Sequence, residues 1–131
     1  MMRQISTNEA PQAIGPYSQA IVANGLVYTS GQIALMPDGK MEDRGIEYQT
    51  KQVLKNLYYV LRAADSSFNH VIKTTIYLAD MDDFSKVNEI YEHYFGEHKP
   101  ARSTVAVKTL PKNALVEIEC IAFADQDVDF G

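Results

Sequence analysis

The fold is decided by two alternating segments near the end of the chain, Lys99-Pro-Ala-Arg-Ser-Thr-Val-Ala-Val107 and Ala114-Leu-Val-Glu-Ile-Glu-Cys-Ile-Ala-Phe-Ala124. Successive side chains of an extended segment point to opposite faces, so each segment has two distinct faces. One face of the second segment is wholly apolar: Val116, Ile118, Cys120, Ala122 and Ala124. The other face carries Leu115, Glu117, Glu119, Ile121 and Phe123. The alternation predicts two strands, joined by a turn at 109–114 that contains a proline and an asparagine.

Two carboxylates lie within the most apolar predicted strand, Glu117 and Glu119. An unpaired charge in that position is costly unless it is hydrogen-bonded or open to a cleft. Arg102, in the first segment, is a candidate partner if the two strands lie near each other. The pattern alone leaves two interpretations open: a structural salt bridge between strands, or a cation and an acid/base group at one functional site.

Composition restricts the class of protein. A chain of 131 residues predicts a single domain, 1–131, large enough to bury a core. The net charge of −5, without a run of Lys or Arg, argues against a nucleic-acid partner. No apolar run approaches the roughly 20 residues of a membrane span, and the first residues lack the apolar centre of a secretory signal. With its lone cysteine the chain forms no internal disulfide, so we expect a cytoplasmic protein, with residues 125–131 as a short, flexible acidic tail.

The remaining patterns predict strands at 3–6, 17–23, 26–30 and 71–78, and helices at about 44–64 and 81–95. Asn24-Gly25 between apolar runs is a strong hairpin signal. Asp43 and Asp80 are the expected N-caps of the two helices. In strand 71–78, simple alternation places Ile72 on the face of Thr74, Ile76 and Leu78, with Val71 on the other face.

Two amphipathic helices need a sheet to cover, so the order β-β-β-α-β-α-β-β predicts a two-layer α+β fold. We expect a mixed sheet of about six strands with both helices on one face. The open face should carry five polar residues: Lys73, Arg102, Thr104, Glu117 and Glu119. Lys73 is a further candidate partner for either glutamate. The apolar residues expected beside them (Leu115, Ile121 and Tyr77) predict that another subunit covers this face in a symmetric oligomer.

Several chemistries find no support in the sequence. The three histidines (His70, His93 and His98) have no metal-binding spacing, and Cys120 belongs to the apolar face, so no metal site is expected. The chain contains no Gly-x-Ser-x-Gly elbow and no glycine-rich nucleotide loop, so neither a serine nucleophile nor a nucleotide cofactor is expected. No cofactor of any kind is expected.

A small constellation remains: Arg102, Glu117 and, with them, Tyr17 and the Ser30-Gly31 turn. A guanidinium fork can hold both oxygens of a small carboxylate, each charge-assisted bond contributing about 1.5–3 kcal/mol. A carboxylate opposite it can orient and activate water. These groups predict hydrolysis or tautomerisation of a small organic acid without a metal.

Five motifs in this order resemble the RidA/YjgF/L-PSP family of enamine and imine deaminases: Ile14-Gly-Pro-Tyr-Ser-Gln-Ala20, Tyr28-Thr-Ser-Gly-Gln-Ile33, Val87-Asn-Glu-Ile-Tyr91, Phe95-Gly-Glu-His-Lys-Pro-Ala-Arg-Ser103 and Leu115-Val-Glu-Ile-Glu119. The resemblance runs from about residue 5 to 124. It implies a chorismate-mutase-like fold and a homotrimer with a ligand cleft at each subunit interface. It also implies cofactor-independent hydrolysis of 2-iminobutanoate and 2-iminopropanoate to 2-oxo acids and ammonia, which pre-empts damage by 2-aminoacrylate.

The resemblance also implies residue roles. Arg102 would bind the substrate carboxylate and Glu117 would activate the water. Tyr17 would line the cleft as a third catalytic residue. The implied substrate-binding residues are Ser30, Gly31, Thr104, Asn88 and Phe84. Many relatives have cysteine where this chain has Thr104, which retains a hydroxyl and the same backbone amide. We therefore expect activity to persist with a different substrate preference.

Two other functions stay open at this point. A non-catalytic regulatory protein of amino-acid metabolism would use the same arginine and cleft to bind a small carboxylate. Some relatives have been described as endoribonucleases or translation inhibitors, but the acidic balance of this chain argues against strong RNA binding.

Overall fold

The computed structural model describes residues 2–124. The strands are β1 (Met2–Ile5), β2 (Ala20–Ala23), β3 (Leu26–Thr29), β4 (Val71–Leu78), β5 (Ala101–Ala106) and β6 (Val116–Phe123). The α-helices are α1 (Ile46–Ala63) and α2 (Phe84–Phe95). Short 3₁₀ turns lie at η1 (Phe68–His70), η2 (Met81–Asp83) and η3 (Pro111–Asn113). The flexible acidic tail expected at 125–131 lies outside the described residues.

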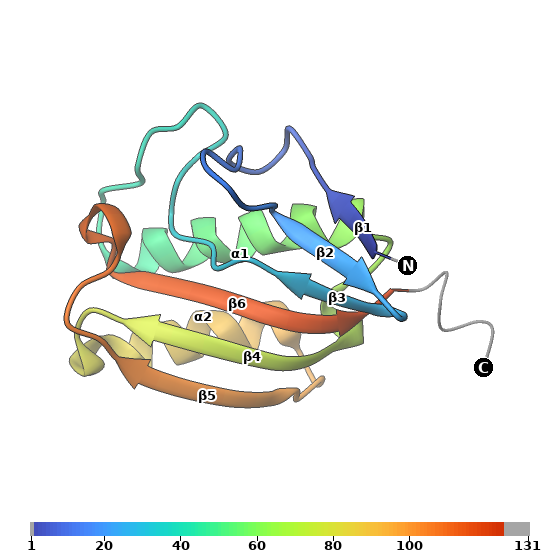
Figure 1. The fold of residues 1–131 in the computed structure, drawn as a ribbon. Helices are drawn as coiled ribbons and strands as arrows, with labels where there is room; N and C mark the ends of the chain where they lie inside the picture. The colour runs from blue at the N-terminus through green and yellow to red at the C-terminus, as the bar shows by residue number, and fades with distance from the viewer. Residues whose placement is uncertain (1, 125–131) are drawn as a thin grey trace.

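The strands form one mixed sheet in the order β1-β2-β3-β6-β4-β5. Only the pairing of β4 with β5 is parallel within residues 2–124, because α2 crosses over between these strands. Both helices lie on the same face of the sheet (Figure 1). The predicted two-layer α+β architecture is thus confirmed. None of the described helices is long and apolar enough to cross a membrane.

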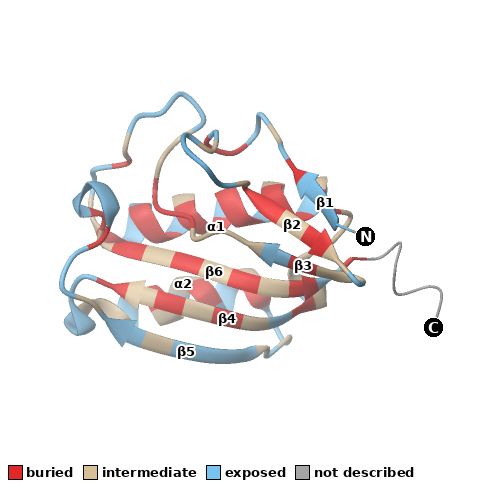
Figure 2. Ribbon diagram, viewed as in Figure 1, coloured by how far each residue is buried: buried red, intermediate tan, exposed pale blue. Residues whose placement is uncertain are grey.

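The core lies between the sheet and the two helices. The predicted apolar face of β6 is buried throughout, from Val116 to Ala124. The opposite face of β6, with Glu117 and Glu119, is partly buried, so the strand alternates along its length (Figure 2). Cys120 lies in the core as expected, 4% exposed.

The hairpin turn forms where the sequence predicted it, but β2 is shorter than expected. Asn24 and Gly25 have φ values of 51° and 78°, the pair of positive angles that a type I′ turn requires. Residues 17–19, predicted as strand, are irregular, and Ser30 binds the carbonyl groups of two of them. Its amide donates to Gln19 O (2.9 Å) and its hydroxyl to Ser18 O (2.6 Å). This contact brings the loop before β2 to the end of β3.

The two expected helix caps have different outcomes. Asp43 does not cap α1: Gly45 is the N-cap residue, at φ 111°, and no side chain caps the helix. Just before α1, the carboxylate of Glu42 accepts a hydrogen bond from the guanidinium of Arg44 at 2.7 Å. Asp80 accepts a hydrogen bond from the amide of Asp82 and so caps the 3₁₀ turn that leads into α2, as predicted.

A β-bulge changes the faces at the start of β4. The register of β4 against β6 shifts between Val71 and Lys73. Val71 is consequently buried in the core, whereas Ile72 is 39% exposed. The simple alternation predicted from the sequence was wrong for these two residues, because a bulge inserts one residue that the pairing does not use.

Candidate functional site

Glu117 faces away from the core near the start of β6, where the chain that follows β3 runs close beside it. Gln32 exchanges both backbone hydrogen bonds with Ile118, at 2.9 and 3.1 Å. This pairing presses Gly31 against the Glu117 side chain. A Cβ built on Gly31 would lie 2.8 Å from Glu117 Cδ and would overlap a carboxylate oxygen. Glycine is therefore required at position 31 for Glu117 to lie where it does.

Glu117 is a partly buried carboxyl group without a cationic partner. Within residues 2–124, the ion pairs are Arg3–Asp65 and Arg44–Glu42, and neither involves Glu117. Burial raises the pKa of Glu117, and the nearby charge of Glu119 raises this pKa further. Such a carboxyl group is a stronger base than an ordinary one, which suits proton transfer.

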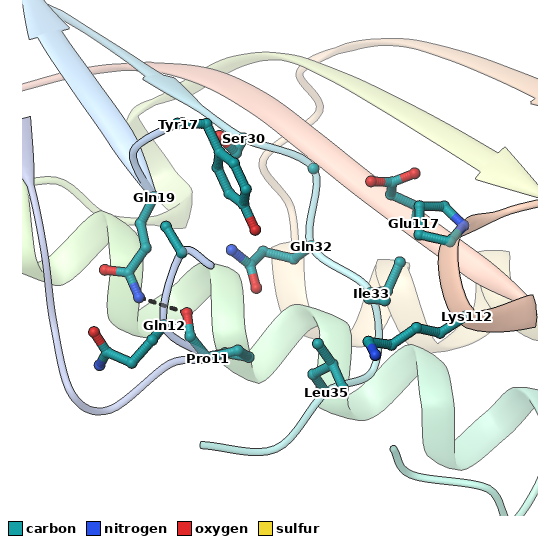
Figure 3. Close-up of a pocket in the computed structure, with 13 residues that line it drawn as sticks. Pro11, Gln12, Tyr17, Gln19, Ser30, Gln32, Ile33, Leu35, Lys112 and Glu117 are labelled. Carbon is teal, nitrogen blue, oxygen red and sulfur yellow. Dashed lines mark hydrogen bonds between the residues drawn. The ribbon is translucent and has the colours of Figure 1, made fainter. Parts of the chain in front are cut away.

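A pocket of about 430 Å³ brings four predicted site residues together: Tyr17, Ser30, Gly31 and Glu117 (Figure 3). Its lining also includes Gln19, Gln32 and Lys112, which the sequence analysis did not assign to the site. The two glutamines lie inside the quoted family motifs, so the motifs contained the signal that could have found them. Lys112 lies outside the quoted motifs, so no sequence motif pointed to its place in the pocket.

Gln19 explains how the wall of this pocket is held. Its side chain, 3% exposed, donates to the carbonyl groups of Thr7 (3.1 Å) and Pro11 (2.7 Å) and accepts from the Thr7 amide (2.7 Å). All of these partners lie in the loop that precedes β2. Gln19 thus fixes this loop opposite the chain that follows β3.

Arg102 lies elsewhere, at the sheet edge formed by β5. Its Nη1 donates to Asn88 Oδ1 at 2.7 Å. Its guanidinium carbon lies 5.4 Å from the ring centre of Phe84 and 4.9 Å from that of Tyr91, a residue of the quoted motifs that the sequence did not assign to the site. All three partners belong to α2. The prediction that Arg102 lies on the open face was therefore wrong: it lies on the helix-covered side, where cation–π contacts hold it.

The prediction that Thr104 lies on the open face was also wrong. Thr104 follows Arg102 by two residues and lies on the same, helix-covered face of β5. Its register partner is Ile76, a core residue of β4. The Thr104 hydroxyl oxygen is buried and has no hydrogen-bond partner within the described chain. The open face of β5 instead carries Ser103, whose hydroxyl accepts a hydrogen bond from Lys73 Nζ at 2.9 Å.

In one chain, Arg102 and Glu117 do not meet. Arg102 and Asn88 line a second pocket, of about 400 Å³, and strand β4 lies between β5 and β6. The interpretation of Arg102 and a β6 glutamate as a structural salt bridge is therefore wrong for residues 2–124. The predicted pairing of Lys73 with a glutamate is also wrong, because Lys73 binds Ser103, and Glu119 accepts a hydrogen bond from the Tyr77 hydroxyl at 3.2 Å.

Two other chemistries can be assessed from the geometry. Burial raises the pKa of the Cys120 thiol to about 12, so it carries almost no thiolate at neutral pH. Among residues 2–124, no three His, Cys, Asp or Glu side chains gather closely enough to hold a metal ion.

Comparison with known proteins identifies the family. Residues 7–124 match the family model described as endoribonuclease L-PSP. The chain belongs to the L-PSP family. It is 55% identical to Reactive Intermediate Deaminase A, chloroplastic, of Arabidopsis thaliana over 90% of this chain and 64% of that protein. It is 51% identical to the 2-iminobutanoate/2-iminopropanoate deaminase of Mus musculus, over 90% of this chain and 88% of that protein.

A solved relative has a bound amino acid. The crystal structure of E. coli TdcF with bound serine superimposes with a TM-score of 0.88 at 39% identity, covering 92% of this chain and 98% of that chain. A protein with this fold thus binds the amino acid serine.

Proposed function

We propose that this chain is a 2-imino acid deaminase, which hydrolyses 2-iminobutanoate and 2-iminopropanoate to 2-oxo acids and ammonia. One observation carries the proposal: a basic carboxylate, Glu117, and a held guanidinium, Arg102, are each exposed to a pocket and have no oppositely charged partner within residues 2–124. An imino acid presents a carboxylate for the arginine and an electrophilic carbon for a water that Glu117 activates. The names of the Arabidopsis and mouse relatives support this activity.

The reaction needs one group that accepts and returns protons. Glu117 takes a proton from water as the oxygen adds to the C=N carbon, and it returns this proton to the nitrogen to give a carbinolamine. Glu117 then takes the proton of the carbinolamine hydroxyl and passes it to the nitrogen, so that the C=O bond forms as the C–N bond breaks and ammonia leaves. An acid/base group contributes about 10²–10⁴-fold to such a step. Arg102 adds to the rate by holding the reacting carbon beside the water.

Each complete site requires two chains. Arg102 and Glu117 lie in different pockets of one chain, so a second copy must bring its β5 edge to the pocket of Glu117. A closed ring of three copies, as the family resemblance implies, provides three such sites. In this arrangement Tyr17, Ser30 and Gly31 come from one chain. Asn88, Phe84 and Thr104 come from the other, where Asn88 and Phe84 fix the arginine.

The single-domain organisation of residues 1–131 and the cytoplasmic location both stay predictions. The Arabidopsis relative is named chloroplastic, so members of this family are not confined to one compartment.

The test uses 2-iminobutanoate made in situ from threonine by threonine dehydratase, with semicarbazide competing for the imine. Wild type is expected to accelerate the release of 2-oxobutanoate. Arg102→Ala and Glu117→Gln are each expected to lose about 10²-fold or more of this acceleration. Arg62→Ala and Glu89→Gln are matched controls, because both residues are exposed on the helices and lie outside the two pockets.

Two outcomes would change the conclusion. If wild type gives no acceleration but 2-oxobutanoate binds, the chain is a small-carboxylate sensor of the kind the sequence left open. If all variants accelerate equally, the chain is a deaminase but the site is elsewhere. Binding of 2-oxobutanoate to Glu117→Gln, measured by NMR, separates the loss of chemistry from the loss of binding.

A further inference from the structure

Gln32 is a largely buried residue whose side-chain amide opens into the pocket and has no hydrogen-bond partner among residues 2–124. It is 7% exposed, and its backbone forms both hydrogen bonds of the bridge to Ile118. Its side-chain amide lies within the pocket of Glu117, where Figure 3 shows it pointing into the open space. No residue from 2 to 124 forms a hydrogen bond with this amide. The unpartnered buried side-chain atom of residues 2–124 is the Thr104 hydroxyl, so the amide nitrogen and oxygen of Gln32 are themselves open to the pocket. A ligand group that pairs with them can replace water there.

Gln32 is distinct from the other buried glutamine of this pocket. Gln19 uses both its nitrogen and its oxygen to hold the loop that precedes β2. The amide of Gln32 holds nothing in the described chain. Gln19 is therefore explained by the fold, and Gln32 is not.

The position of Gln32 separates it from the reacting end of the site. Gln32 pairs with Ile118, whose side chain lies in the core, whereas the neighbouring residue of β6, Glu117, faces the opposite side. Paired residues of antiparallel strands share a face, so Gln32 and Glu117 lie on opposite sides of the sheet at its edge. The pocket passes from Glu117 over Gly31 to Gln32. A group that binds Gln32 is thus not the C=N group beside Glu117.

The lining of the pocket near Gln32 is mixed in character. Apolar side chains, such as Ile33 and Leu35, line the pocket beside Gln32. This combination fits an alkyl chain that ends in one hydrogen-bonding group.

We propose that Gln32 forms a side-chain subsite that selects 2-imino acids with a terminal hydroxyl group. The inference rests on the proposed function, since it assigns the end of the substrate that Glu117 and Arg102 do not bind. An amide both donates and accepts, and so does a hydroxyl. Glu117 and Lys112 give this pocket one charge of each sign, so a second carboxylate or an ammonium group is attracted by one of them and repelled by the other. A neutral end is the one that both charges tolerate.

The test compares two ligands that differ only in a hydroxyl and a methyl group. Binding of 4-hydroxy-2-oxobutanoate and 2-oxopentanoate is measured by NMR titration. Turnover is measured with the corresponding imines, made from homoserine and norvaline by an amino-acid oxidase. Gln32→Met keeps the length of the side chain but removes its hydrogen bonds. Gln4→Met is the matched control, on the exposed strand β1.

Wild type and Gln4→Met are expected to favour the hydroxylated ligand by about tenfold or more, because a site built to pair a hydroxyl rejects the methyl analogue. In Gln32→Met the preference is expected to fall within about twofold of unity. No preference in wild type, or an unchanged preference in Gln32→Met, overturns the subsite, as does a failure to bind either ligand. If the preference in binding holds but 2-iminobutanoate is not hydrolysed, the proposed function alone fails.

Discussion

The fold raises the pKa of Glu117, so this carboxyl group keeps its proton to a higher pH than an ordinary glutamate does. Burial is the first cause of its raised pKa, and the charge of Glu119, two residues along the same face of β6, is the second. Between the unfolded and the folded pKa, the native state binds more protons than the unfolded state. Stability therefore falls as the pH rises through this window and stays lower at neutral pH. The site is thus a place where the chain gives up stability for a more basic group.

The contribution of Glu119 can be removed separately. In Glu119→Gln the pKa of Glu117 is expected to fall toward the ordinary range, because the neighbouring negative charge is gone while burial is unchanged. The measurement is a ¹³C NMR titration of the Glu117 carboxyl carbon. Glu89→Gln, on the exposed surface of α2, is the control and should leave the titration in place. A pKa that is unchanged or higher in Glu119→Gln would contradict the assignment.

At the scale of elements, the segment that continues β3 places the carboxylate of Glu117, the proposed acid/base group. Residues 30–32 leave the regular pairing of β3 but rejoin β6 through the bridge between Gln32 and Ile118. This path brings the backbone at Gly31 against Glu117. Glu117 can therefore lie in this position only because Gly31 has no side chain.

Gly31→Ala is expected to lower kcat/KM for 2-iminobutanoate by about 10²-fold, since the new methyl group displaces the Glu117 carboxylate. The free energy of unfolding in urea should change little, because the flexible end of Glu117 can move aside. Gly39→Ala is an informative contrast. Gly39 has φ 89° and open space around it, so alanine should reduce stability there while kcat/KM is kept. An active Gly31→Ala variant would show that the reaction does not depend on this contact.

Local sequence rules predicted most elements because the information lies within each segment. Strands β4 and β6 follow from their own alternation, and the hairpin turn follows from Asn24-Gly25. The errors concern relations between segments. The bulge that buries Val71 depends on the pairing of β4 with β6. Alternation also states which residues of β5 share a face but not which face meets the helices, so Arg102 was placed on the wrong side.

The same distinction, between information within one segment and relations between segments, applies to the candidate site. Motif resemblance grouped Tyr17, Ser30, Gly31 and Glu117, and the structure brings these four to one pocket. The contact of Gly31 with Glu117 depends on the register of two strands, which no local pattern specifies. Gln32 lies inside a quoted motif, but its local pattern is that of any polar residue at the end of a strand, so alternation alone did not assign it to the site.

At the scale of the whole molecule, the open face of the sheet is incompletely covered. Tyr28, Val105 and Phe123 are each more than 40% exposed, and they lie on β3, β5 and β6. Exposed apolar surface of this kind is typical of a protein interface. The same chain separates Arg102 and Glu117 into different pockets. Both observations support an assembly in which copies complete each other's sites.

Mixing two inactive variants tests this assembly directly. Arg102→Ala retains an intact Glu117, and Glu117→Gln retains an intact Arg102. If each site takes one residue from each of two neighbouring chains, oligomers refolded from an equal mixture contain about a quarter of sites with both residues intact. The expected result is recovery of about a quarter of wild-type activity toward 2-iminobutanoate. A site contained within one chain gives no recovery, because every chain then lacks one of the two groups. The mixture of Arg102→Ala with the double variant Arg102→Ala/Glu117→Gln must stay inactive, since no chain in it supplies the guanidinium. Recovery only in the first mixture therefore establishes that the arginine and the glutamate act across an interface.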